Sequence, residues 1–191
     1  MWKHVIIDDF LSKKHFDYIN EVFDTKPIKN KKPQIVSHSY RVNADGVKQY
    51  SNFKGNIISD KFDQNVIREI YETYTPRLMD ILKELAPEKV SKYHHSAIIF
   101  VVTPKDHVYP NHTDSEHKLL SVVVYLKPEN NTGTILYETK DKKNPQTVEW
   151  KPNRALIFSR SDNTWHSYQG DGVNDRYALV FNLTANVDEF N

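Results

Sequence analysis

The second half of the chain is a succession of short segments that read as β-strands, and this feature limits the fold more than any other. Each segment is rich in β-branched and aromatic residues, and turn-forming residues separate it from the next. The candidate strands are residues 93–103, 119–126, 134–138, 147–151, 155–159, 164–168 and 176–183. Seven short strands after two helical regions predict a mainly β protein with flanking helices. Its core is expected to be a jelly-roll or cupin-like sandwich, also called a double-stranded β-helix.

The first half supplies the two helices and a polar segment between them. Residues 5–10 read as a short strand, and Ser12 can cap a helix with an apolar face of Phe16, Ile19, Val22 and Phe23. Helical spacing recurs over residues 59–85, where Pro76 is expected to kink or divide the helix. Residues 25–56 are polar with little periodicity, so we expect long loops with short strands there. Loops of that length are often lids or binding loops.

Length, charge and residue usage limit the classes of function. A chain of 191 residues can form one substantial core, so we expect a single domain with helical and loop support in 1–90 and the jelly-roll core in 91–191. With 26 basic and 25 acidic residues the net charge is +1, which favours neither nucleic acid nor a membrane as partner. No apolar stretch could span a bilayer or serve as a signal peptide. The absence of cysteine excludes disulfides and thiolate metal sites, and a cytoplasmic location is the default expectation.

The sequence around residue 112 contains the side chains of a metal site. In an extended segment His112 and Asp114 point to the same face and can bind one ion together. A second histidine, His166, can reach the same ion from a different part of the fold. Two imidazoles and one carboxylate on one side of a metal leave the opposite positions open. This arrangement is typical of non-haem Fe(II) in oxygen chemistry.

A basic residue follows the distal histidine at a suitable distance. The turn-rich residues 169–175 predict a β-hairpin that joins the strand of His166 to the strand that begins at Arg176. With the turn centred near Asp171, Arg176 would lie directly opposite His166 on the same side of the sheet. A guanidinium there could hold a carboxylate near the metal. The alternative is a structural arginine that pairs with Asp175 or Asp171.

The remaining histidines permit a different metal cluster on paper. His107, His112 and His117 are spaced by five residues, which places neighbours on opposite faces of a strand and argues against a shared ion. His117 and Lys118 could line the entrance to the site. We expect surface or hydrogen-bonded positions for His4, His15, His38, His94, His95, His107 and His117.

With these residues, the C-terminal half resembles the Fe(II)- and 2-oxoglutarate-dependent dioxygenases, and more narrowly their prolyl-4-hydroxylase-like branch. The family's pattern is a His-x-Asp pair, a distal His and a basic residue about ten positions later. His112, Asp114, His166 and Arg176 match that pattern. The resemblance implies that the first three bind Fe(II) and that Arg176 binds 2-oxoglutarate.

Further matches lie around these residues. Members of the prolyl branch often carry a Tyr three residues before the first His, and Tyr109 matches it as a substrate contact or a packing residue. The resemblance implies that Tyr125, in a Tyr-Leu pair, donates a hydroxyl to the far carboxylate of 2-oxoglutarate. Thr134 lies in a strand similar to the family's glycine-rich strand and is a further cosubstrate contact. Trp165 is either a core aromatic or a second substrate contact.

Two departures from the family pattern narrow the function. Many relatives have a Ser two positions after the Arg, and here Ala178 replaces it, so anchoring falls more heavily on Arg176 and Tyr125. The nucleic-acid demethylase branch has a second Arg where this chain has Asn182, which argues against base repair. Asp114 is present where the halogenating branch has a small residue, which favours hydroxylation.

The resemblance implies a hydroxylase that uses Fe(II), 2-oxoglutarate and O2 to oxidise an unactivated C–H bond. Its substrate could be a peptidyl residue such as proline, or a small molecule, sugar or nucleotide, because family members with the same iron residues act on very different molecules. A third hypothesis is a cupin-like module that binds metal without turnover. An acid anchor beside an open iron site argues against that third hypothesis.

Overall fold

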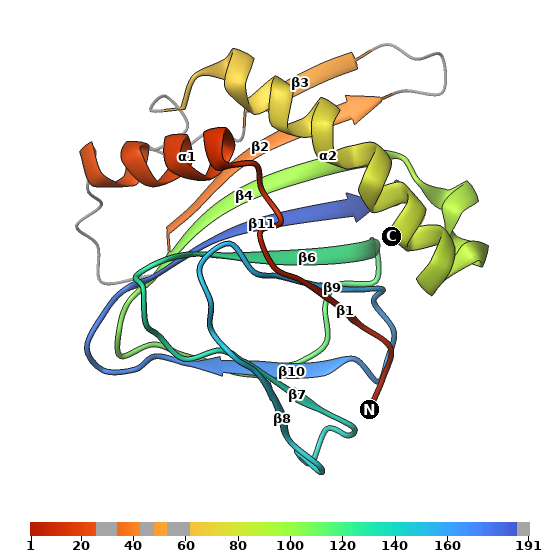
Figure 1. The fold of residues 1–191 in the computed structure, drawn as a ribbon. Helices are drawn as coiled ribbons and strands as arrows, with labels where there is room; N and C mark the ends of the chain where they lie inside the picture. Colours follow the sequence, from red (N-terminus) through yellow and green to blue (C-terminus); the bar gives the residue numbers. More distant parts are fainter. Residues whose placement is uncertain (26–33, 43–47, 53–61, 187–191) are drawn as a thin grey trace.

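The computed structural model describes residues 1–25, 34–42, 48–52 and 62–186. Two antiparallel sheets form its core (Figure 1). The large sheet has the order β1-β9-β6-β11-β4-β2-β3, and its strands are Val5–Ile7, Ala155–Phe158, Lys118–Lys127, Arg176–Thr184, His95–Thr103, Gln34–Val42 and Lys48–Asn52. The small sheet has the order β5-β10-β7-β8, with strands Val108–His112, Trp165–Gln169, Thr134–Tyr137 and Gln146–Val148. The predicted jelly-roll is confirmed.

The helices cover the face of the large sheet that points away from the small sheet (Figure 1). They are α1 (Lys13–Thr25), α2 (Gln64–Leu85) and the short 3-10 helix η2 (Pro87–Lys92). Ring contacts tie them to β11, because Tyr71 of α2 lies 5.4 Å from Phe181 and Phe23 of α1 lies 5.0 Å from Tyr177. Pro76 lies inside α2 without dividing it, and the helix is capped by Asp63 rather than beginning near Ser59.

Strand β11 separates the core from the interior of the sandwich. Leu179, Phe181 and Leu183 are fully buried in the cluster beneath the helices, because side chains alternate between the two faces of a strand. The alternate side chains Arg176, Ala178 and Val180 line a cavity between the two sheets. One strand therefore stabilises the fold with one face and contributes to the candidate site with the other.

The predicted hairpin between His166 and Arg176 is wrong. Strand β10 pairs with β5 and β7 in the small sheet, whereas β11 pairs with β4 and β6 in the large sheet. The turn-rich segment between them crosses from one sheet to the other. Gly170, at the start of this crossing, packs closely against the backbone of Lys105. A Cβ added at Gly170 would lie 1.8 Å from the Lys105 carbonyl oxygen. The local turn signal is real, but it does not reveal which sheet the next strand joins.

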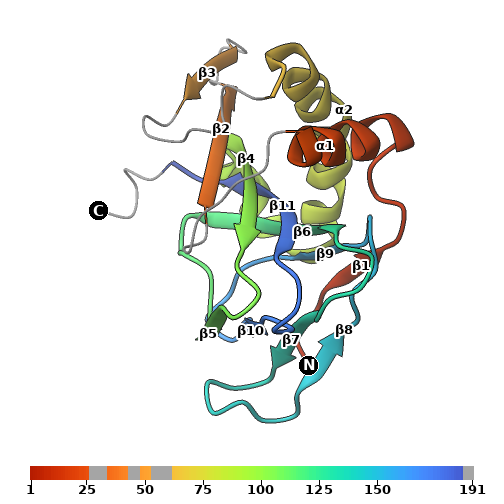
Figure 2. The same ribbon diagram turned by 90° about the vertical axis from the view of Figure 1, so that its left-hand side faces the viewer.

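The segment between the helices contains more regular structure than expected. Strand β2 has nine residues and pairs along its length with β4, and β3 pairs with β2. Figure 2 shows both strands at the end of the molecule farthest from the small sheet. The rest of the segment, in which a lid was expected, lies outside the described residues. Strand β5 was not among the predicted strands. No helix in the described parts of the chain is long and apolar enough to cross a membrane.

Candidate active site

Three potential metal ligands meet between the two sheets. Strand β5 ends at His112, which is the register partner of His166 on β10, and Asp114 follows two residues later. One ligand atom from each residue lies within 4.8 Å of the others, and the two imidazole centroids are 4.3 Å apart. Among the described residues, this is the one group of three such side chains that could hold an ion. The alternative built on His107 and His117 does not form there.

Backbone contacts orient both imidazoles for metal binding. The Nδ1 atom of His112 lies 2.8 Å from the Pro110 carbonyl oxygen, and that of His166 lies 2.9 Å from the Thr164 carbonyl oxygen. A carbonyl only accepts, so each Nδ1 carries the proton and each Nε2 keeps its lone pair for a ligand. Burial lowers the pKa of His166 below its ordinary value, which favours the neutral, metal-binding form. Such contacts are the usual support of a metal-binding histidine.

Asp114 is held as a carboxylate by its neighbours. Its Oδ1 lies 2.8 Å from the Lys118 ammonium, and its Oδ2 accepts a hydrogen bond from the Ser121 hydroxyl. Burial by itself raises the pKa of Asp114, but the charge of Lys118 and these hydrogen bonds outweigh it, so that the pKa lies below its ordinary value. Two neutral imidazoles and one carboxylate match the ligand set of non-haem Fe(II).

The triad opens into a cavity of about 200 Å³, and Arg176 lies in its wall. Arg176 is only 7% exposed, and its Nε has no hydrogen-bond partner. No carboxylate of the described residues forms an ion pair with it. Asp175 instead accepts from the backbone N–H of Lys105, and Asp171 accepts from the backbone N–H groups of its own turn. The structural pairing considered for Arg176 is therefore not formed.

Aromatic rings and one hydroxyl hold the guanidinium in place. Its central carbon lies 4.0 Å from the ring centroid of Tyr168 and 5.2 Å from that of Tyr125. Its Nη2 donates to the Thr134 hydroxyl oxygen over 3.3 Å. Burial lowers the pKa of Arg176 from its ordinary value. A buried cation that lacks a counter-ion is stabilised by an anionic ligand.

The other predicted contacts divide into two groups. Tyr109 and Thr134 line the cavity, whereas the structure does not place Tyr125 or Trp165 in its wall. The Tyr125 hydroxyl donates to the Thr134 hydroxyl over 2.8 Å and accepts from the Thr134 backbone N–H over 3.1 Å. Tyr125 thus positions Thr134, and Thr134 is the residue that lines the cavity. Trp165 is partly exposed and forms no part of the buried core clusters.

Two residues of the site were not singled out from the sequence. Tyr168 stacks on Arg176, and strand alternation could have indicated it because it lies two residues after His166. Ser121 bonds to Asp114 from the neighbouring strand β6. No local sequence pattern reports that contact, since it depends on how the two sheets pack.

Comparison with known proteins agrees with this geometry. Residues 95–184 match the family model of the 2OG-Fe(II) oxygenase superfamily. The matched region contains the triad, Thr134 and Arg176. This region, just under half of the chain, is therefore similar to that superfamily. The family consists of oxidoreductases that use Fe(II), 2-oxoglutarate and O2. No curated protein matches the chain.

Solved structures of this fold include enzymes with different substrates. A prolyl-4-hydroxylase from Pseudomonas putida is 14% identical with a TM-score of 0.57, and the match covers 96% of this chain and 92% of that one. A prolyl hydroxylase from Trichoplax adhaerens, in complex with a hypoxia inducible factor peptide, is 12% identical with a TM-score of 0.61 and coverages of 95% and 83%. The dioxygenase for auxin oxidation 1 from Arabidopsis thaliana, bound to 2-oxoglutarate, is 12% identical with a TM-score of 0.62 and coverages of 98% and 85%. At these identities the similarity establishes the fold.

Proposed function

We propose that the protein is a hydroxylase in which His112, Asp114 and His166 hold Fe(II) and Arg176 holds 2-oxoglutarate. The observation that carries this proposal is the pairing of two features in one cavity. Three ligand atoms lie within 4.8 Å of one another, and a buried guanidinium without a carboxylate partner lies in the same wall. A metal-binding module without turnover has no need of the second feature.

The residues of the chain bind, orient and exclude water. When bound, iron and cosubstrate together supply the oxidant that attacks a C–H bond, with succinate and CO2 as coproducts. Arg176 fits both oxygens of the far carboxylate with its planar fork. Ser121 orients Asp114 through its Oδ2, and the two backbone carbonyls fix the imidazoles.

Apolar side chains surround this polar centre. Much of the cavity wall is apolar and consists of Val101, Val123, Phe158, Ala178 and Val180. An apolar wall keeps water from a reactive oxidant and strengthens the electrostatic contact between Arg176 and an acid. The cavity therefore suits a reaction that oxidises a C–H bond while excluding side reactions.

For the substrate, we favour a peptidyl residue, with proline as the first candidate. Tyr109 lines the cavity at the position that matches the prolyl branch, and its ring lies 5.9 Å from the ring of His112. The similarity of fold to a peptide-bound prolyl hydroxylase supports this choice. The alternative is a small molecule, which the similarity to the auxin-oxidising dioxygenase supports.

Two measurements test the function. The protein with Fe(II), 2-oxoglutarate and O2 is expected to form succinate, and Asp114→Ala is expected to abolish it, while Asp17→Ala on the exposed face of α1 retains it. Succinate formation that survives Asp114→Ala would contradict the metal assignment. Proline-containing peptides and a metabolite extract are then incubated separately, and mass spectrometry identifies the product that gains one oxygen. Oxygen on a free metabolite alone would exclude the peptide and leave the iron site unaffected.

A further inference from the structure

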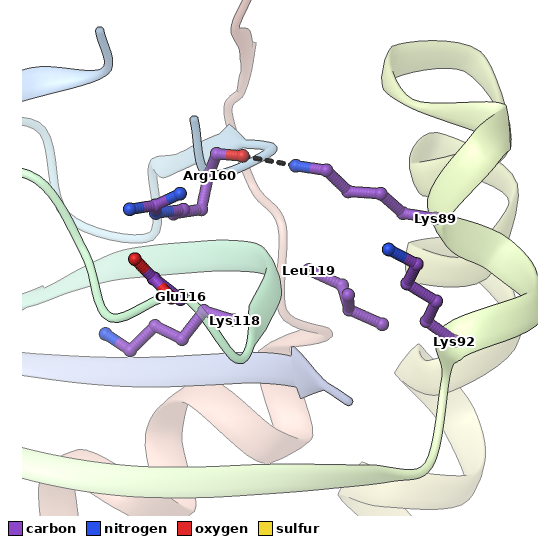
Figure 3. Close-up of a pocket in the computed structure, with 6 residues that line it drawn as sticks. All are labelled: Lys89, Lys92, Glu116, Lys118, Leu119 and Arg160. Carbon is purple, nitrogen blue, oxygen red and sulfur yellow. Dashed lines mark hydrogen bonds between the residues drawn. The ribbon is translucent and has the colours of Figure 1, made fainter. Parts of the chain in front are cut away.

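A second cavity, of about 210 Å³, shares Lys118 with the cavity of the candidate active site. Figure 3 shows the side chains that line it. Its lining residues are Lys89, Lys92, Glu116, Lys118, Leu119 and Arg160, and we call it the basic cavity. Lys89 and Lys92 extend toward it from η2 (Figure 3). Lys118 of β6 and Arg160 after β9 also line it, but the Lys118 ammonium and the Arg160 guanidinium point away from the two lysines (Figure 3). Four of the six lining side chains are cations, and Glu116 is the single acid.

Two of these cations lack an acidic partner within the described residues. The Lys89 ammonium donates to the Ser159 hydroxyl oxygen over 2.9 Å and to the Arg160 carbonyl oxygen, both of which are neutral. Burial lowers the pKa of Lys89 from its ordinary value. Lys92 is exposed and forms no ion pair there. A partly buried ammonium with only neutral acceptors is a site that an anion would stabilise.

The other two cations connect the basic cavity to the proposed metal site. Lys118 lines both cavities, and its ammonium lies 2.8 Å from the Asp114 carboxylate. Arg160 donates from Nε to the Asp114 backbone carbonyl over 3.1 Å and pairs through Nη2 with the exposed Asp162 at 2.8 Å. An anion in the basic cavity would therefore lie beside the Asp114 side of the metal site. Arg176 serves a different part of the first cavity.

We propose that the basic cavity binds a carboxylate or phosphate of the substrate and thereby selects the carbon that is oxidised. This inference rests on the proposed function, because it assigns the substrate's anionic group to a place beside the same site. The ammonium groups of Lys89 and Lys92 suit either kind of oxyanion, because lysine acts as a point charge with three donors. The net charge of the chain is only +1, so the chain as a whole supplies no strong attraction for anions.

A titration of the iron-free protein tests the inference directly. Inorganic phosphate and acetate are added separately at constant ionic strength, and backbone amide shifts are followed by NMR. We expect saturable shifts at Leu119 and Arg160. Lys92→Glu should weaken the binding by roughly tenfold, because it replaces an attractive charge by a repulsive one. Lys13→Glu, which makes the same charge change on the exposed face of α1, should leave the binding unaltered.

The outcomes separate this inference from the function on which it rests. Tighter binding of phosphate would identify a phosphoryl group, and tighter binding of acetate would identify a carboxylate. Shifts that do not saturate, or that Lys92→Glu and Lys13→Glu weaken equally, would overturn the proposal. Shifts at Thr134 and Tyr168 report the separate binding of anions at Arg176. Anion binding in the titration does not require iron, and succinate formation does not require the basic cavity. A failure of the anion-binding proposal can therefore be distinguished from a failure of the proposed function.

Discussion

At the scale of single residues, Arg176 is the most informative side chain of the cavity. It is almost fully buried, stacks on Tyr168, and has no carboxylate partner among the described residues. Its position follows from β11, whose cavity-facing side chains begin with it. A structural arginine would pair with an acid of the protein, whereas a ligand-binding arginine remains unpaired until the ligand arrives.

Replacing Arg176 by alanine should selectively weaken cosubstrate binding. Loss of one partner of a buried charge pair costs about 2–5 kcal/mol, which corresponds to roughly 30-fold to several thousandfold in affinity for 2-oxoglutarate. The affinity for the metal should change little. Arg154→Ala, which removes an arginine paired with Asp8 on the surface, serves as the matched control. Calorimetric titration measures both ligands. An unaltered affinity for 2-oxoglutarate in Arg176→Ala would show that another residue anchors the acid.

The hydroxyl of Tyr125 should matter through Thr134 rather than by touching the cosubstrate. Tyr125→Phe removes hydrogen bonds to Thr134, and one such bond contributes on the order of 1 kcal/mol to stability. Thr134→Val removes the same contact from the other side. The two changes should therefore be less than additive in the free energy of unfolding, which urea denaturation of the single and double variants measures. Full additivity would mean that the two hydroxyls act independently.

At the scale of elements, strand β11 links the stability of the core to the geometry of the site. Phe181 packs under the ring of Tyr71 and is fully buried, whereas Arg176 lies on the opposite face of the same strand. Phe181→Ala should cost about 3–5 kcal/mol in the free energy of unfolding. Val173→Ala in the exposed crossing segment should change it by less than about 0.5 kcal/mol. Similar losses for both variants in denaturant titrations would contradict the assignment of the core.

The sequence predicted elements well where the signal is local. Strands β6, β9 and β11 are apolar runs bounded by turn residues, and their predicted and observed limits differ by at most one residue. The hairpin prediction failed because pairing between strands depends on long-range packing. His166 and Arg176 nevertheless line the same cavity, as the hairpin prediction implied. They reach it from the two opposite sheets.

At the scale of the whole molecule, the two-sheet sandwich gathers residues that are distant in sequence. Strand count and the two helices were enough to predict a jelly-roll, but the division of strands between sheets was not predictable from periodicity. For the same reason, the contact between Ser121 and Asp114 and the basic cavity emerged only from the structure. Metal ligands were the predictable part of the site because their residue types are restricted by chemistry.

Binding of metal and acid should stabilise the whole fold. A ligand at 100 times its dissociation constant adds about 2.7 kcal/mol, which corresponds to roughly 5–10 °C in Tm for a chain of this size. Mn(II) can replace Fe(II) to avoid turnover. In thermal unfolding, 2-oxoglutarate should raise the Tm of the wild-type protein more in the presence of Mn(II) than in the presence of a chelator. For Arg176→Ala, Mn(II) should still raise Tm, whereas 2-oxoglutarate should add no further increase. An equal gain from 2-oxoglutarate without metal would show that the acid binds elsewhere.

The most direct test of the central claim is the visible spectrum of the protein with Fe(II) and 2-oxoglutarate in the absence of O2. A keto acid that chelates ferrous iron gives a weak metal-to-ligand charge-transfer band. We expect the wild-type protein to show this band and His112→Ala, Asp114→Ala and His166→Ala to lose it. A band of full strength in His166→Ala would contradict the proposed metal centre.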